Sequence, residues 1–146
     1  MSYKGLFKPK NPTKYKGNPS NIVYRSSWEL KFMSYLDSHP DVLSWGSEEF
    51  CIPYRSPLDG RYHRYFPDFY VEKVNPRGQE ETLVVEIKPS KETKPPTPQT
   101  KKTKRYLKEV YTWGINNAKW EAAKQFCNQR NWRFVVLTEH ELGINI

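Results

Sequence analysis

The sequence has few of the residues that hold secreted domains or zinc sites together. Two cysteines, Cys51 and Cys127, are too few for a disulfide framework. Neither has a Cys or His partner at the spacing of a zinc site, and the three histidines are scattered along the chain. The composition therefore excludes a disulfide-stabilised scaffold and a zinc-binding domain.

Long apolar runs are also missing. No stretch is long enough to cross a bilayer, and the chain has no signal-peptide core, so we expect a soluble, intracellular protein without a membrane partner. The length of 146 residues suits one domain with its own core. The 36% of hydrophobic and 15% of aromatic residues argue against a disordered chain.

Positive charge is concentrated in two segments. The chain has a formal net charge of +8, residues 1–25 contain six Lys or Arg and no acid, and residues 89–108 contain seven Lys or Arg and one acid. The rest of the chain is mildly acidic. This distribution favours a protein that binds phosphates with its periphery, although a solubilising tail and a solvated linker would give the same pattern.

The N-terminal part divides into an arm and the start of a domain. Residues 1–21 lack periodicity and are rich in Lys, Gly, Pro and Asn, which predicts an extended, poorly ordered basic arm. Residues 22–146 are predicted to form a single domain. Its first helix should begin at Ser26 or Ser27 and end near Ser38, with one apolar face.

Alternating and aromatic runs predict a sheet. Three strands are expected at 47–54, 62–73 and 82–88, and the turns between them indicate an antiparallel meander. The Lys- and Pro-rich segment 89–104 must be an exposed loop. The remaining elements are expected to be a short helix at about 104–112 ended by Gly114, a helix from Asn116 or Asn117 to Gln129, and a strand at 132–138 paired in parallel. The predicted fold class is therefore α/β, with a mixed four-stranded sheet flanked by helices.

The run Val84-Val85-Glu86-Ile87-Lys88 places two charges inside an apolar strand. Side chains alternate along a strand, so Glu86 and Lys88 point to one face while Val85 and Ile87 point to the other. Such charges are costly in a core unless they are paired or hold a metal. Asp68, after Pro67, supplies a second carboxylate from a strand that can lie alongside. The alternative is an exposed edge-strand pair with Asp68 as a turn residue.

These residues suit metal-dependent hydrolysis of a phosphodiester. Asp68 and Glu86 would hold Mg²⁺, for which Mn²⁺ should substitute, and the backbone carbonyl of Ile87 would be a further ligand. Lys88 would orient or deprotonate the attacking water and offset the phosphate charge. No small-molecule cofactor is expected.

Three charged residues outside these two strands each allow a functional and a structural interpretation. Glu29 is either a third acid of the site or the last residue of a Ser-x-x-Glu capping box at the helix start. Arg25 and Lys119 either meet DNA phosphates or are solvated charges. The basic loop and the residues next to it supply the other predicted DNA contacts, namely Lys91, Lys94, Lys101, Lys102, Lys104 and Arg105.

These motifs together resemble the PD-(D/E)xK nuclease superfamily. The match consists of Pro67-Asp68, Glu86-Ile87-Lys88 and Glu29 on the leading helix, while 24–29, 116–119 and 132–139 resemble its TnsA-like branch. Within that branch the chain resembles the head completion nucleases of T-even-type tailed phages.

The resemblance implies properties that the composition alone does not. It implies a restriction-endonuclease-like core, Mg²⁺ dependence, and double-stranded phage DNA as substrate. Glu29, Asp68 and Glu86 would be the metal ligands and Lys88 the catalytic lysine. It also implies action after DNA packaging and before tail joining, near portal or neck proteins, with the host cytoplasm as the main location and the virion head or neck as the alternative.

Two other functions stay open from the sequence. A structural, DNA-contacting head or neck protein could have a nuclease fold in which cleavage is dispensable. A transposition or repair endonuclease acting with a partner protein would have the same motifs.

Overall fold

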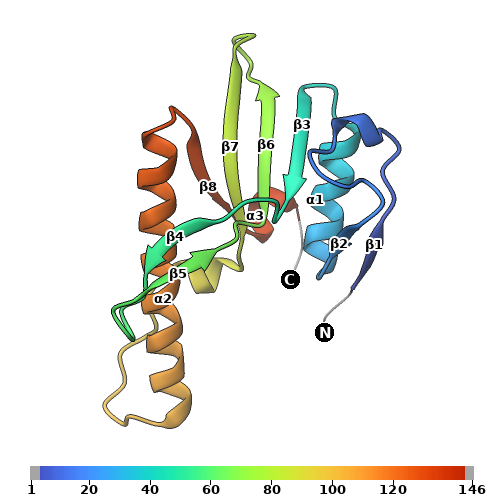
Figure 1. Ribbon diagram of the computed structural model, residues 1–146. Helices are drawn as coiled ribbons and strands as arrows, with labels where there is room; N and C mark the ends of the chain where they lie inside the picture. The colour runs from blue at the N-terminus through green and yellow to red at the C-terminus, as the bar shows by residue number, and fades with distance from the viewer. Residues whose placement is uncertain (1–3, 144–146) are drawn as a thin grey trace.

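The computed structural model describes residues 4–143 and is built around a four-stranded mixed sheet (Figure 1). The strand order is β3-β6-β7-β8, where β3 is Val42–Ser47, β6 is Phe69–Val74, β7 is Glu80–Ile87 and β8 is Arg133–Leu137. The pairs β3–β6 and β6–β7 are antiparallel, and β7–β8 is parallel. The predicted α/β class and mixed four-stranded sheet are confirmed.

Helices pack on both faces of the sheet. Helix α1 (Ser27–Ser38) and the short α3 (Glu139–Leu142) cover one face, where Phe32, Leu36 and Leu142 pack against Phe69 and Val85. Helix α2 (Lys104–Asn128) lies on the other side and runs along β8 and the hairpin of β4 (Ile52–Arg55) and β5 (Tyr62–Tyr65) (Figure 1). On this second face α2 lies chiefly against β8, and the part of the face over β3 and β6 carries polar side chains such as Ser44 and Glu72. No helix in the described part of the chain is both long and apolar enough to cross a membrane.

The predicted meander is wrong in its first strand. The edge strand of the sheet is β3, whereas 52–55 and 62–65 form a separate antiparallel hairpin of β4 (Ile52–Arg55) and β5 (Tyr62–Tyr65). The predicted strand at 62–73 is interrupted after Tyr65 and resumes as β6 at Phe69. Pro67 lies in this interruption and cannot donate to a sheet ladder, which explains the break.

The second half of the chain contains one long helix instead of two. The predicted break at Gly114 is wrong, because α2 runs through Gly114 as one helix of 25 residues. Trp113 and Trp120 on either side pack against each other and into the cluster around Tyr65, and this packing outweighs the cost of about 1 kcal/mol for a glycine inside a helix. Pro57 lies 3.8 Å from the position that a Cβ of Gly114 would take.

The N-terminal segment is packed against the domain, in contrast to the poorly ordered arm that the sequence predicts. Residues from 4 onward form β1 (Gly5–Phe7), the 3-10 turn η1 (Pro12–Lys14) and β2 (Ile22–Tyr24), with β1 and β2 paired antiparallel. The amide groups of Lys10 and Asn11 donate to the buried carboxylate of Asp37 at the end of α1. Buried backbone-to-carboxylate bonds of this kind give the segment a fixed path that composition does not reveal.

Candidate active site

Asp68 and Glu86 meet at one end of the sheet. Phe69 pairs with Val85 in the antiparallel register of β6 and β7, so the residues just beyond, Asp68 and Glu86, lie opposite each other. The Ile87 amide donates to Asp68 Oδ2 at 2.8 Å, which fixes that carboxyl group. Val85 packs in the core on the α1 side, while Glu86 points to the α2 side, as strand alternation predicts.

The two carboxyl groups share a poorly solvated environment. Burial, followed by the neighbouring charge of Glu86, raises the pKa of Asp68 to about 8, and a hydrogen bond joins the two carboxyl groups. Burial also raises the pKa of Glu86, opposed by the Tyr65 hydrogen bond and by the charge of Lys88. Near neutral pH the pair therefore retains a proton when no cation is present.

Two lysines stand beside this acid pair. Lys88 follows β7 directly, and its amide donates to the Leu137 carbonyl of β8 at 2.9 Å, which fixes its backbone. Lys119, from α2, has its Nζ 5.7 Å from the ring centres of both Tyr54 and Tyr65. Both ammonium groups lower the pKa of Glu86. The predicted DNA-binding residue Lys119 thus lies at the same site as the predicted catalytic residue Lys88.

Glu29 fulfils the predicted capping role and also lies near the acid pair. Its amide donates to Ser26 Oγ at 3.1 Å, and its Oε1 accepts from the Arg25 amide at 3.3 Å. Burial and then the charge of Asp68 raise the pKa of Glu29, so the two acids interact electrostatically. Between residues 4 and 143 no three His, Cys, Asp or Glu side chains are gathered closely enough to enclose a metal ion.

The oxygen-rich acid pair fits a hard divalent cation. Mg²⁺ is held in proteins by one or two carboxylates and retains several waters, so two convergent carboxyl groups are sufficient. Because burial and then the charge of Glu86 raise the pKa of Asp68, a cation would have to displace the proton of the pair, and its positive charge would relieve the repulsion between the two carboxylates. Asp68 and Glu86 therefore have the oxygen donors that a hard divalent cation prefers.

Two residues at the site were not predicted from the sequence. Tyr65 is 4% exposed and donates from its hydroxyl to Glu86 Oε1 at 3.0 Å. Glu48, directly after β3, forms an ion pair with Arg25, and its charge acts on Asp68 and Glu29. An aromatic-rich strand was the only sequence signal for Tyr65. Glu48 had none, because the sequence placed it inside the predicted strand 47–54, whereas it lies between β3 and β4.

The remaining predicted DNA-binding residues are exposed and lie apart from the acid pair along the chain. They belong to the basic loop 89–104 and the first turn of α2, which extend beyond the sheet (Figure 1). The loop begins with the 3-10 turn η2 (Ser90–Thr93), and the Ser90 amide donates to Glu139 at 2.8 Å. Lys91 and Lys94 line a cavity of about 460 Å³ between the loop and Trp113 of α2.

Comparisons with known proteins agree on one kind of activity. Residues 39–139 match the model of the TnsA-like endonuclease N-terminal domain. The chain is also similar to the head completion nuclease of Enterobacteria phage T4, with 42% identity over 97% of this chain and 95% of that protein. The region matched by the family model contains Asp68, Glu86, Lys88 and Lys119 and begins after Glu29.

Proposed function

Because the chain belongs to the family of TnsA-like endonucleases, we propose that it hydrolyses DNA phosphodiester bonds with Mg²⁺ at the Asp68–Glu86 site. The observation that supports this most strongly is the pair of convergent, poorly solvated carboxyl groups with Lys88 and Lys119 beside them. This combination of two acids and an adjacent amine is also what we expect of a PD-(D/E)xK site.

Each side chain has a distinct task in this proposal. Asp68 and Glu86 would hold the cation, with the Ile87 carbonyl and Glu29 as further ligands. When bound, the cation would supply charge neutralisation at the phosphate and a lower pKa for the attacking water. Lys88 would orient that water and receive or relay its proton. Tyr65 would hold the Glu86 carboxylate in one orientation through its 3.0 Å hydrogen bond.

Binding of the substrate would rely on charge. Lys119 and Arg25 would contact phosphates close to the acid pair, and the basic loop would contact the backbone farther along double-stranded DNA. Contacts to phosphates carry no sequence information, so we expect weak sequence preference and a strong dependence of affinity on salt.

We place this activity in the completion of a phage head, by analogy with the phage T4 relative. The enzyme would act in the cytoplasm of the infected host on packaged DNA, before tail joining and close to portal or neck proteins. The 42% identity over nearly the full length of both proteins supports this role over that of a transposition or repair endonuclease.

Plasmid cleavage tests the activity. The wild type should nick or linearise supercoiled DNA with Mg²⁺ or Mn²⁺ and not with EDTA, and Asp68→Ala and Lys88→Ala should be inactive. Glu72→Gln, which changes a charge on β6 in an ion pair with Lys16, is a control that should cut normally. Equal cleavage by wild type and Asp68→Ala would refute the proposal.

Complementation tests the biological role. In a host infected by a phage that lacks this protein, the wild-type chain should restore joined, infectious particles and Asp68→Ala should not. Restoration by Asp68→Ala would show a structural, DNA-contacting role in which cleavage is dispensable.

A further inference from the structure

Glu48 has a backbone conformation that L-residues rarely adopt. Its φ is +52°, in the left-handed region, which costs roughly 1 kcal/mol for a residue other than glycine. The other non-glycine residue with positive φ in the described chain is Asn131, which follows the end of α2, where asparagine is a usual residue. A glutamate kept in a conformation better suited to glycine suggests that its carboxylate has a task.

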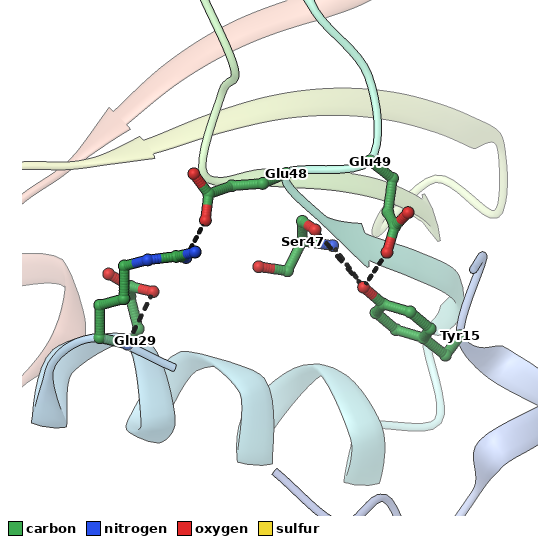
Figure 2. Close-up of polar contacts among 6 residues, drawn as sticks. Tyr15, Glu29, Ser47, Glu48 and Glu49 are labelled. Carbon is green, nitrogen blue, oxygen red and sulfur yellow. Dashed lines mark hydrogen bonds and ion pairs between the residues drawn. The ribbon is translucent and has the colours of Figure 1, made fainter. Parts of the chain in front are cut away.

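The segment around Glu48 is held by the N-terminal arm and by β6. The Glu48 amide donates to the Asp68 carbonyl at 3.2 Å. The Tyr15 hydroxyl accepts from the Ser47 amide at 3.2 Å and donates to Glu49 Oε1 at 2.5 Å, so it fixes the residues on both sides of Glu48 (Figure 2). Tyr15 itself is buried and packs edge-on against Trp45. The position of Glu48 is thus set by segments far apart in the sequence.

From this position the Glu48 side chain reaches the start of α1. Figure 2 shows its carboxylate extending toward the end of the helix that carries Glu29. There it forms an ion pair with the Arg25 guanidinium, while the Arg25 amide donates to Glu29. Within the described residues the guanidinium has no second hydrogen-bond partner, so most of its five N–H donors are free, and its side chain is 55% exposed. An arginine held at one nitrogen and open at the others is prepared to bind an anion.

We propose that Glu48 is a positioning residue, which holds Arg25 next to Glu29 at the start of α1 so that its free N–H groups meet a DNA phosphate. This inference rests on the proposed endonuclease function. It predicts that the change in DNA affinity caused by removing Glu48 is opposite in sign to a simple charge effect. Removing a negative charge near a DNA path generally strengthens binding, whereas here the loss of Glu48 releases Arg25 and should weaken it.

A matched pair of variants separates these effects. Glu48→Gln removes the carboxylate charge with little change in shape. Glu72→Gln is the matched control, because it removes a charge from an ion pair with Lys16 of nearly the same exposure. The side chains of Lys16 and Glu72 are 52% and 32% exposed, and those of Arg25 and Glu48 are 55% and 34% exposed. We would measure the Kd for a labelled DNA duplex by fluorescence anisotropy in EDTA, and kcat and KM for cleavage with Mg²⁺.

We expect Glu48→Gln to raise Kd about threefold, the size expected for one exposed ion pair, and to lower kcat/KM by at least the same factor. Glu72→Gln should leave both unchanged or bind slightly more tightly. In the Arg25→Ala background, Glu48→Gln should no longer weaken binding, and the Kd should stay the same or fall slightly, because Glu48 aids binding only through Arg25 and its unpaired charge would otherwise repel DNA. Two outcomes would overturn the proposal. One is tighter DNA binding by Glu48→Gln in the otherwise wild-type protein, and the other is the same loss of affinity from Glu48→Gln in the Arg25→Ala background as in the wild type.

Glu48→Gly distinguishes positioning from a role in stability. Glycine relieves the strain of the left-handed conformation, so Tm should stay within about 3 °C of the wild type while the DNA affinity still falls. A Tm loss that accounts for the functional loss would overturn the positioning role. A wild type that binds DNA but does not cut it would refute the endonuclease proposal, and the anisotropy series would still test Glu48.

Discussion

The acid pair at the ends of β6 and β7 and the basic loop 89–104 are built in opposite ways. Asp68 and Glu86 are held by neighbouring groups, namely the Ile87 amide and the Tyr65 hydroxyl. The lysines of the loop, by contrast, are exposed to solvent. Chemistry requires groups placed within about 0.5 Å, whereas attraction of a polyanion requires only charge of the right sign. We therefore expect substitutions in the first region to affect turnover and those in the second to affect affinity.

The largest contrast is expected for Glu86→Gln, which keeps the shape of the side chain and removes its negative charge. Cleavage should fall by at least about 100-fold, since even outer-shell changes at metal sites cost about 10- to 100-fold. Affinity for duplex DNA in EDTA should be unchanged or higher. Single-turnover cleavage and anisotropy measure the two quantities. A parallel loss of affinity would show that the acid pair also organises DNA binding.

Tyr65→Phe tests whether the acid pair depends on its supporting hydrogen bond. Loss of the hydroxyl leaves Glu86 Oε1 with one partner fewer inside the fold, so we expect cleavage to fall about tenfold with little change in Kd. Tyr54→Phe is the matched control, because Tyr54 is also buried and also lies beneath Lys119. Equal effects of the two variants would assign the loss to packing or to Lys119 instead.

Substitutions in the basic loop should show the complementary pattern. The double variant Lys101→Ala/Lys102→Ala should weaken DNA binding several-fold at low salt. It should also reduce the slope of log K against log salt concentration by about 1 for each of these lysines that binds a phosphate in the wild type. The value of kcat at saturating DNA should stay unchanged. Glu92→Gln, in the same loop, is a control for local structure and should not weaken binding. A drop in kcat would show that the loop takes part in the chemistry.

The smallest predicted effect concerns stability and pH. The folded-state pKa of Asp68 is raised from 3.8 to about 8, so the folded protein retains a proton that the unfolded chain has released between these values. Stability without a cation should therefore fall as the pH rises from 4 to 8.

Asp68→Asn removes this titration, so the stability of the variant should depend less on pH. At pH 8 without a cation, its Tm should be at least about 3 °C higher than that of the wild type. Lys91→Ala, in the exposed loop, should leave the pH dependence as it is. Thermal melts in EDTA across this range measure both. A wild type with no loss of stability toward pH 8 would contradict the raised pKa.

The periodic parts of the chain were predictable, and the irregular parts were not. The capping box at Ser26, the alternation at Glu86 and the parallel last strand all follow from local pattern, and the structure confirms them. The edge strand β3 and the uninterrupted α2 were missed. In both cases packing against distant segments overrides a weak or contrary local signal.

Local chemistry was enough to name the residue types of the candidate site, because an acid and an amine two residues apart on an apolar strand need a reason to be there. It was also enough to propose which of them carry the reaction. Their surroundings were not accessible in this way. The Tyr65 hydroxyl, the Lys119 ammonium and the Glu48–Arg25 pair reach the acids from a hairpin, a helix and two strand ends far apart in the sequence. Contacts of this kind depend on how separate elements pack, and no short stretch of sequence specifies that packing.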